Sequence, residues 1–383
     1  MKNILFITGS DKLSGPNKQL LNLIKALSRE NKEYKVIIYI CKIIKNKKKS
    51  LIPEISKIKN IKYYFTNKKT NNNFSFKLIS NLFDIFKLNK KYNFDFIQTS
   101  GIIPDSYMFI LKKLFFLKSK WISVIRSQIE IEYKIRYKNL ILYKILAIFH
   151  KFIINLSDKK ICVSNSVAKH IMNKNKNFYL LLNSLSLEDE KMILNFFEKN
   201  NQKHKNNNLR MSTKNFMYVG HFDELKNPLL LIDYWAKYKP ENSNLYLYGS
   251  KVKSNYFDDL EKKTNKTSNA FINGFKKNII KEFLNKNYYI SASRTEGFPN
   301  TVIEALCTGC ICILSSIPPH NEIKKLFPNY VFLYKQNSLE SLNDVVQKII
   351  INKSSVPKRK ISREAIRFFS SKKLNNKYIR ILE

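Results

Sequence analysis

Glycine and acidic residues are both scarce in this chain. Eight glycines and 29 aspartates and glutamates occur among 383 residues, against 69 lysines and arginines. The glycines are Gly9, Gly15, Gly101, Gly220, Gly249, Gly274, Gly297 and Gly309. A chain so poor in glycine is expected to keep it where the backbone conformation or the close approach of a ligand demands it. Most of them fall at the end of an expected strand or helix, and in parallel sheets ligands bind at the carboxyl ends of the strands.

Cysteine is also scarce, and its spacing shows no disulfide framework. Five is an odd number, which argues for a reducing cytoplasm in which the thiols stay free. Cys307 and Cys310 have the spacing of half a metal site, but no second pair and no nearby histidine completes one. We therefore expect buried thiols at a helix end and in a strand.

Long apolar runs are absent too. No uninterrupted run reaches the roughly 18 residues of a spanning helix. The segment 1–9 is too short for a signal peptide, lacks a cleavage site, and is typical of a first β-strand. The length suits two domains, and a hydrophobic content of 44% is that of a globular protein. We expect a cytoplasmic protein, and peripheral attachment to the inner face of the cell membrane is left open.

The shortage of acids gives a formal net charge of +40. The excess is spread over the chain, with +23 in residues 1–190 and +17 in the rest. An anionic membrane surface and nucleic acid are both partners for such a charge. Coding bias toward A/T-rich codons is a third explanation, because Lys, Asn, Ile, Phe and Tyr are plentiful while Gly and Ala are few. No nucleic-acid-binding motif occurs, so nucleic acid is not expected as a partner.

Strand-like apolar runs alternate with helix-like periodic stretches, which predicts an α/β fold with parallel sheets. Strands are expected at 2–8, 34–41, 94–99, 121–125, 160–163, 215–219, 245–248, 270–272, 288–291 and 311–314, and helices at 17–28, 166–172 and 363–382. We expect an N-terminal Rossmann-like domain over 1–190, a mobile linker region over 191–214, a C-terminal Rossmann-like domain over 215–362, and a terminal helix over 363–383.

The segment 293–304 is the most informative in the chain. It places Glu296 and Glu304 with seven residues between them, a Gly-Phe-Pro-Asn turn after the first and an apolar helical run around the second. A short buried strand precedes them, so the unit is strand, loop and helix. The free backbone N–H groups at the helix start, near Asn300 and Thr301, favour a phosphate group. Two carboxylates and an anion site suit a sugar that carries a phosphate.

This segment resembles the E-x7-E element of the retaining glycosyltransferases of family 4, also called glycosyl transferases group 1, and segments 305–309 and 317–323 continue the likeness. The resemblance implies a GT-B architecture, with two Rossmann-like domains facing a cleft and the terminal helix crossing back to the first. It implies transfer of a hexosyl or N-acetylhexosaminyl group, with retention, from a nucleotide-sugar donor to an acceptor hydroxyl. The acceptor implied is a lipid-linked glycan for a cell-surface polysaccharide such as a capsule, O-antigen or lipopolysaccharide.

The resemblance also assigns roles within this segment. Glu296 is the expected catalytic residue, because it would accept hydrogen bonds from the donor sugar, and Glu304 would bind the ribose. Gly297, Phe298, Asn300 and Thr301 are the other donor-binding residues that it implies here.

Three further positions are implied elsewhere in the chain. Segment 218–228 resembles the family's V-G-R-F…K-N-P element, in which an arginine and a lysine hold the donor diphosphate. Lys226 matches the lysine of this element, whereas His221 stands where arginine is usual. The resemblance therefore supports a diphosphate contact for Lys226 more fully than for His221. Gly15 lies in a loop like the family's Gly-rich first loop. Arg126 occupies a place where many relatives have histidine, and is a candidate for the sugar or acceptor side.

Two further features bear on cofactors and partners. No Asp-x-Asp motif occurs, so Lys226 and the helix start are expected to supply the positive charge that a metal would supply. No cofactor is expected besides the nucleotide-sugar co-substrate.

The long apolar segment 139–156 contains several basic residues and is either a half-buried helix or an interfacial helix that docks on anionic lipid. Two other functions stay open: a GT-B-fold epimerase or phosphorylase, and a non-catalytic module that binds acidic lipid or polymer.

Overall fold

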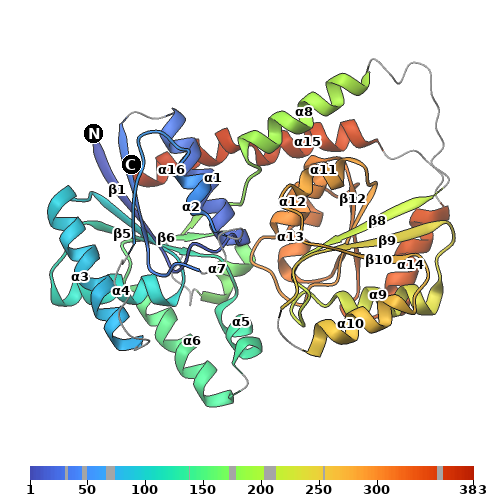
Figure 1. The fold of residues 1–383 in the computed structure, drawn as a ribbon, viewed down its shortest axis with the longest axis horizontal. Helices are drawn as coiled ribbons and strands as arrows, with labels where there is room; N and C mark the ends of the chain where they lie inside the picture. The colour runs from blue at the N-terminus through green and yellow to red at the C-terminus, as the bar shows by residue number, and fades with distance from the viewer. Residues whose placement is uncertain are drawn as a thin grey trace. The chain divides into compact units, whose positions relative to one another are not determined.

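The structure is a computed structural model that describes residues 1–30, 33–44, 50–65, 74–137, 139–171, 178–201, 213–252, 255–351 and 357–383. The chain forms two compact units (Figure 1). The first comprises Met1–Leu182 together with Ser371–Glu383, and the second comprises Asn183–Ser370.

Over the described residues, the first unit is built on a seven-stranded parallel sheet in the order β3-β2-β1-β4-β5-β6-β7. Its strands are β1 (Lys2–Thr8), β2 (Tyr34–Ile40), β3 (Lys62–Phe65), β4 (Phe96–Thr99), β5 (Lys120–Ile125), β6 (Lys159–Cys162) and β7 (Tyr179–Leu180). The central strands are nearly continuous runs of buried apolar residues, as in β1 and β2. This is the pattern of a parallel sheet that is covered on both faces.

Helices cover the two faces of this sheet (Figure 1). Leucines and isoleucines of α1 and α16 pack on one face, and α3, α4 and α6 pack on the other. The helices of the unit are α1 (Gly15–Glu30), α2 (Ile52–Ile55), α3 (Phe74–Tyr92), α4 (Ile102–Leu114), α5 (Ile129–Arg136), α6 (Leu140–Asn155), α7 (Asn165–Ile171) and α16 (Ser371–Leu382).

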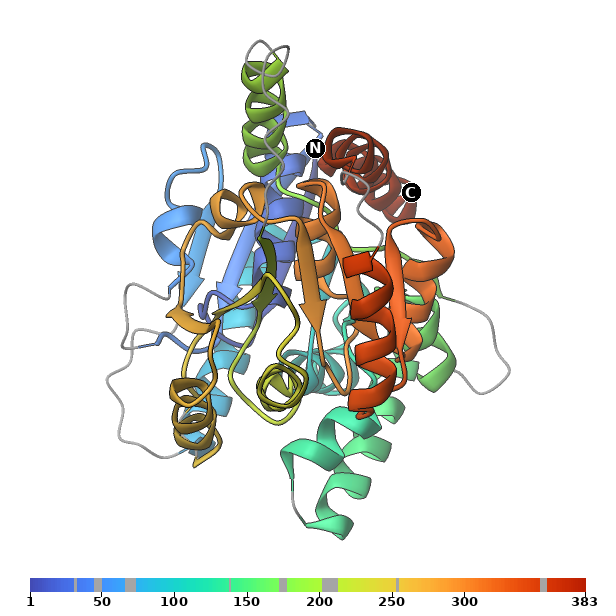
Figure 2. The same cartoon turned by 90° about the vertical axis from the view of Figure 1, so that its right-hand side faces the viewer.

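The second unit repeats the design with a parallel sheet that has six strands over the described residues, in the order β10-β9-β8-β11-β12-β13 (Figure 2). Its strands are β8 (Lys214–Val219), β9 (Ser243–Tyr248), β10 (Ala270–Gly274), β11 (Tyr288–Ser291), β12 (Ile311–Ser315) and β13 (Val331–Tyr334). Its helices are α8 (Leu187–Asn201), α9 (Pro228–Tyr238), α10 (Asn255–Asn265), α11 (Ile279–Leu284), α12 (Asn300–Cys307), α13 (Pro318–Leu326), α14 (Leu339–Ile351) and α15 (Lys358–Phe369). The α/β class with two Rossmann-like parallel-sheet units is therefore confirmed.

Both sheets share one topological feature that positions the sites below. The strand order reverses between β1 and β4 in the first unit and between β8 and β11 in the second. At such a switch point the loops that follow the two strands diverge to opposite faces, and the crevice between them is where doubly wound sheets bind ligands. The loops after β1, β4, β8 and β11 are thus singled out by topology.

The expected linker over 191–214 is wrong in its first part, because residues 191–201 belong to α8. The Ser186 hydroxyl accepts a hydrogen bond from the Asp189 N–H at 3.0 Å, and Asp189 lies among three acids in the first turn. This cap stabilises the start of α8. The sequence analysis missed the helix because the Asn- and Lys-rich composition further along the chain favoured a linker. Ile193 anchors the helix as a fully buried side chain. Residues 202–212 of the expected linker lie outside the described residues.

The unit boundaries also differ from the expected ones. The first unit ends at Leu182 instead of 190, because the backbone N–H of Leu185 bonds to the Phe369 carbonyl of the second unit at 2.9 Å. The expected terminal helix over 363–383 is two helices, because Ser370 has an extended backbone that separates α15 from α16. Only α16 belongs to the first unit, where the Tyr378 hydroxyl donates to Gln98 at 2.6 Å.

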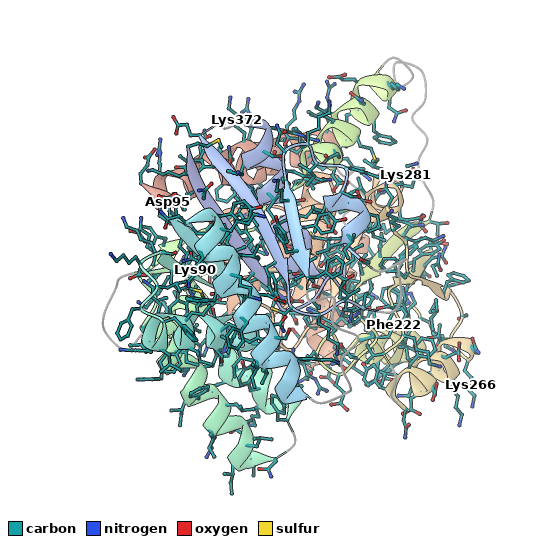
Figure 3. All side chains as sticks on the ribbon, turned by 60° about the vertical axis from the view of Figure 1, so that its left-hand side comes forward. Lys90, Asp95, Phe222, Lys266, Lys281 and Lys372 are labelled. Atoms are coloured by element: carbon teal, nitrogen blue, oxygen red, sulfur yellow. The ribbon has the colours of Figure 1, made fainter. Side chains whose placement is uncertain are left out.

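The basic residues are distributed over the surfaces of both units (Figure 3). Lys90 and Lys372 on the first unit and Lys266 and Lys281 on the second are all exposed. The charge excess is therefore a property of the solvated surface and not of the two cores.

Candidate functional site

The switch point of the second sheet brings together two loops that carry predicted site residues. The loop after β8 contains His221 and Lys226, and the loop after β11 contains Glu296. The backbone N–H of Arg294 donates to the Leu225 carbonyl at 2.8 Å, which ties the loops to each other.

Lys226 and Glu296 form an ion pair at this point. The Ser293 hydroxyl donates to the same Glu296 oxygen, Oε1, at 2.9 Å. The Glu296 side chain is only 14% exposed and that of Lys226 is 26% exposed. Burial alone would raise the pKa of Glu296, but the charge and hydrogen bond of Lys226, with the hydrogen bond from Ser293, favour the carboxylate and lower that pKa. Glu296 is therefore a carboxylate at neutral pH, held in a fixed orientation.

His320 is a functional candidate that the sequence analysis did not single out. Its ring is fully buried, and Nδ1 donates to the Ser315 carbonyl at 2.7 Å. Burial lowers the pKa of His320 to about 4, although the charge of Glu296 opposes this shift. The imidazole is therefore neutral, and within the described part of the chain its Nε2 has no hydrogen-bond partner. The sequence could have pointed to His320 through its position in segment 317–323, which continues the family resemblance.

Glu304 lies about one turn into α12, as predicted from the spacing. Pro299 precedes the helix in an extended conformation and provides no side-chain cap for its first turn. The Thr301 hydroxyl bonds to the Tyr289 hydroxyl at 2.8 Å and ties the helix start to β11. This arrangement has the polarity of an anion site.

Phe298 and Gly297 precede this helix start. The Phe298 side chain is buried and packs against Phe369, with ring centroids 6.1 Å apart, and its carbonyl accepts from Asn183 at 2.6 Å. A ligand contact by Phe298 would therefore use its backbone N–H and not its ring.

His221 lies beside the loop that follows β9. Its Nδ1 bonds to the Ser250 hydroxyl at 2.7 Å. The loops after β8 and β9 can lie this close to each other because residue 249 is glycine. A Cβ added there would lie 1.9 Å from the Gly220 carbonyl oxygen. The role of His221 in holding a diphosphate stays a prediction.

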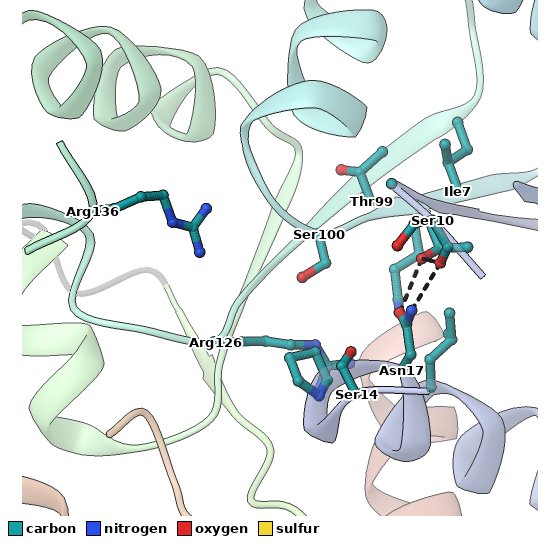
Figure 4. A pocket seen from close by; sticks show the side chains of 13 residues that line it. Ile7, Ser10, Ser14, Asn17, Thr99, Ser100, Arg126 and Arg136 are labelled. Atoms are coloured by element: carbon teal, nitrogen blue, oxygen red, sulfur yellow. Dashed lines mark hydrogen bonds between the residues drawn. The ribbon is translucent and has the colours of Figure 1, made fainter. Parts of the chain in front are cut away.

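Gly15 and Arg126 belong to the first unit, at its own switch point. A pocket of about 320 Å³ there is lined by residues that follow β1, β4 and β5 (Figure 4). Arg126 lines it directly, and Gly15 stands between Ser14 and Pro16, which also line it. The predicted site residues thus fall into two groups, one at each switch point.

The cysteines do not form a metal site in the described part of the chain. All five are buried and free. Burial raises the pKa of Cys307, Cys310 and Cys312, so these thiols stay protonated. No group of three His, Cys, Asp or Glu side chains that could hold a metal ion occurs among the described residues.

Two parallel-sheet units of this kind, each with candidate site residues at its switch point, define a GT-B fold, and the solved structures that share it are GT-B glycosyltransferases. Residues 199–367 match the family model described as Glycosyl transferases group 1. The matched range lies within the second unit and includes segment 293–304, whose resemblance to the same family is described above.

Three relatives illustrate the comparison. Sucrose-phosphate synthase from Thermosynechococcus elongatus is 14% identical, with a TM-score of 0.76 over 100% of this chain and 98% of the other. HepE from Anabaena, in complex with UDP and glucose, is 13% identical, with a TM-score of 0.76 over 100% and 99%. The capsular polysaccharide biosynthesis glycosyltransferase CapH from Staphylococcus aureus is 29% identical over 200 residues. That match spans 51% of this chain and about half, 51%, of CapH.

The buried neutral His320 predicts a pH-dependent stability. Its pKa in the folded protein is about 4, below the 6.5 of the free side chain, so the unfolded chain binds a proton that the folded chain does not. Stability from this residue is complete above pH 6.5 and is lost as the pH falls toward 4. Between pH 7 and pH 5 the loss should be about 2 kcal/mol. Urea unfolding of the wild type and His320→Gln at both pH values measures it, because glutamine does not titrate. The stability gap between the two proteins should shrink by this amount, and an unchanged gap contradicts the prediction.

Proposed function

We propose that this protein is a retaining glycosyltransferase that moves a sugar from a nucleoside-diphosphate sugar to an acceptor hydroxyl in the synthesis of a cell-surface polysaccharide. The observation that carries the proposal is the ionised Glu296, paired with Lys226 and oriented by Ser293 at a switch point. A carboxylate and an ammonium side by side match the two ends of a glycosyl diphosphate, since hydroxyl groups need acceptors and phosphates need cations.

The proposed roles follow from this pairing. Lys226 and the N–H groups at the start of α12 bind the diphosphate and stabilise the charge that grows on it as the bond to the anomeric carbon breaks. Glu296 accepts hydrogen bonds from hydroxyls of the donor sugar. Glu304 binds the ribose hydroxyls. His221 adds a weaker contact to the diphosphate than an arginine would.

Proton transfer can then be assigned. The acceptor oxygen forms its bond to the anomeric carbon and releases a proton, while the diphosphate leaves with the electron pair. The lowered pKa of Glu296 makes it a poor base. The departing phosphate, whose second pKa is about 6, accepts the proton better. Glu296 is therefore proposed to position and stabilise the donor sugar instead of carrying the proton.

Two relatives support the proposed class of donor and the proposed class of product. HepE was crystallised with UDP and glucose, and CapH acts in capsular polysaccharide biosynthesis. We propose by analogy a nucleoside-diphosphate hexose or N-acetylhexosamine as donor, and a lipid-linked glycan intermediate as acceptor.

The two glutamates should respond differently to substitution. Glu304→Gln should weaken binding of the free nucleoside diphosphate, because an amide accepts hydrogen bonds from ribose hydroxyls less well than a carboxylate. Glu296→Gln should leave that affinity nearly unchanged and lower kcat by about 100-fold, since its contact stabilises the transition state. Calorimetric binding and steady-state turnover measure the two effects.

Glu340→Gln is a matched control, because Glu340 is exposed on α14 in the same unit. If Glu296→Gln abolishes nucleotide binding while Glu304→Gln does not, the assigned roles are reversed. If both variants merely unfold the domain, the pair is structural and the proposed function fails.

We propose that transfer needs no divalent metal. Lys226 and the start of α12 supply the positive charge that a metal would otherwise place on the diphosphate. Turnover should be unchanged by a chelator such as EDTA, and adding magnesium or manganese should not restore or raise it. A strict requirement for an added divalent ion in the turnover assay would refute this mechanism.

The same reasoning extends to the membrane, where we propose that α6 docks on an anionic bilayer. Its buried side chains are Ala147, His150, Ile153 and Ile154. Its other side carries an exposed apolar stripe at helical spacing. The stripe consists of Ile141, Ile145, Ile148, Phe149, Phe152 and Leu156. An exposed apolar face of this length on a helix end that projects from its unit marks an interaction surface (Figure 2).

Charge favours lipid over a second copy of this chain as the occupant. Exposed lysines occur on the same helix and on its neighbour: Lys144 lies on α6, and Lys113 lies on α4, which packs against α6. Phe116, just after α4, is 82% exposed. Two copies that met through this surface would bring like charges together, whereas anionic headgroups would neutralise them. In the described ranges, no helix is both long enough and apolar enough to cross a membrane.

Vesicle binding checks this proposal. The protein should sediment with anionic vesicles, and binding should fall with salt because exposed charges are screened over about 10 Å at 0.1 M. Ile145→Ser with Ile148→Ser should weaken binding by at least tenfold, since each isoleucine contributes roughly 1.5–3 kcal/mol when buried. Ile351→Ser, which is 71% exposed on the second unit, should have no effect. Equal binding to neutral vesicles, or concentration-dependent dimerisation that the double variant abolishes, would contradict lipid docking.

A further inference from the structure

The pocket of the first unit is built like a site and lies at a topological switch point. It has a volume of about 320 Å³, at the small end of the roughly 300–1,000 Å³ typical of small-molecule sites. Its lining includes Ser10, Ser14, Asn17, Ser100, Arg126 and Arg136 (Figure 4). The wall is polar and carries two guanidinium groups.

The loop that follows β1 is held rigidly on one side of this pocket. The Thr8 hydroxyl donates to the Asn17 side-chain oxygen at 2.9 Å. The Asn17 amide nitrogen donates to the carbonyls of Ser10 and Lys12, both at 2.8 Å. The start of α1 is therefore fixed against the pocket, and a helix start favours an anion.

Arg126 is the unusual group in this wall. It is partly shielded from solvent, and burial lowers the pKa of its guanidinium to about 10, so it stays charged at neutral pH. Among the described residues it has no ion pair with a carboxylate and no side-chain hydrogen bond. A shielded charge without a counter-charge is costly unless a ligand supplies one.

The acids in this part of the unit are already engaged elsewhere. Asp11 accepts from the Ser50 hydroxyl at 2.5 Å and the Ile44 N–H at 2.7 Å. Asp105 bonds to His150 at 2.9 Å. Arg136, by contrast, pairs with Glu132 at 2.5 Å, so its charge already has a carboxylate partner. The unmatched positive charge of the pocket is therefore that of Arg126.

Two hydroxyl groups complement this charge. The side chains of Ser10 and Ser14 line the pocket and form no hydrogen bond with another described residue. A guanidinium and two hydroxyls can donate to oxygens that point in different directions, which suits a tetrahedral phosphate better than a planar carboxylate.

We propose that this pocket binds a phosphoryl group of a sugar acceptor, with Arg126 as its cationic partner and Ser10 and Ser14 as donors. The inference rests on the proposed transferase function, because it names the class of acceptor: a phosphorylated sugar, free or lipid-linked. The volume leaves room for the sugar beside the phosphate.

A fluorescent reporter for this pocket already exists in the chain. Trp121 Nε1 donates to the Thr99 hydroxyl at 2.7 Å, and Thr99 lines the pocket. The chain has two tryptophans, and Trp235 belongs to the second unit. Because Trp235 Nε1 has no partner within the described ranges, Trp235→Phe breaks no known hydrogen bond. In that background, the emission reports on the first unit alone.

The test is a titration of this variant with glucose 6-phosphate, glucose and glucuronate at constant ionic strength. Glucose 6-phosphate should give a saturable change, and glucose should give none. Arg126→Gln should weaken the phosphate response by about 10- to 100-fold, the loss expected for a charged hydrogen-bonded contact. Arg380→Gln, the same change at an exposed position on α16, should leave it intact.

Several outcomes would overturn the proposal: an equal response to glucose, tighter binding of glucuronate, or an equal effect of Arg126→Gln and Arg380→Gln. If circular dichroism shows that Arg126→Gln does not fold, Arg126→Lys replaces it. Lysine keeps the positive charge but lacks the planar guanidinium, so phosphate affinity must fall by an intermediate amount. Tighter binding of a polyprenyl-linked sugar phosphate in micelles than of glucose 6-phosphate assigns the lipid-linked source, and equal binding assigns the soluble one.

Turnover separates this inference from the proposed function. If sugar transfer proceeds to a neutral acceptor and is unaffected by Arg126→Gln, the phosphate pocket fails while the transferase stands. If no transfer is found although phosphate binding depends on Arg126, the pocket stands and the transferase fails. With both correct, Arg126→Gln raises the KM for a phosphorylated acceptor and leaves the KM for the donor unchanged.

Discussion

The reversal of strand order in each parallel sheet is the constraint on which the rest of this structure depends. Connections between parallel strands are right-handed, so strands added to one side of the first strand send their helices to one face, and strands added to the other side send them to the opposite face. Beside β1 and beside β8, the loops therefore separate and leave the carboxyl ends of two neighbouring strands open. Lys226 and Glu296 follow one such pair of strands, and Ser10 and Ser100 follow the other.

The two switch points differ in how charge is balanced. In the second unit, Lys226 and Glu296 neutralise each other, and Ser293 satisfies the carboxylate further, so a shielded pair of charges is tolerated. Under the proposed function, a bound diphosphate would compete with Glu296 for Lys226, and the hydroxyls of the donor sugar would donate hydrogen bonds to the carboxylate in place of Lys226. In the first unit, Arg126 has no such partner within the described ranges, which is the physical reason for the anionic ligand proposed there.

The outward apolar stripe of α6 is held in place by a buried polar network on its inner side. His150 bonds to Asp105 of α4 and to the Tyr133 hydroxyl of α5, both at 2.9 Å. The hydroxyl of Ser123 on β5 donates to the same carboxylate at 3.1 Å. Such a network fixes which face of the helix is buried, because a rotation of α6 would break both hydrogen bonds of the buried His150 ring. The exposed isoleucines and phenylalanines therefore face outward as a consequence of the polar contacts beneath them.

The sequence alone determined the fold class, most strand positions, and the strand–loop–helix unit that carries Glu296 and Glu304, because buried parallel strands are continuous apolar runs and local spacing survives folding. It also identified Lys226 and Arg126 as candidates. It did not reveal the helix over 191–201, whose cap depends on Ser186, nor the break at Ser370, which separates two helices of continuous amphipathic pattern. Nor could it show that Lys226 reaches Glu296 across 70 residues, that the ring of His320 is neutral, or that Arg126 lacks a carboxylate. These facts concern which charges meet and which are shielded from water, and only the tertiary structure decides them, since they arise between residues that are distant in sequence.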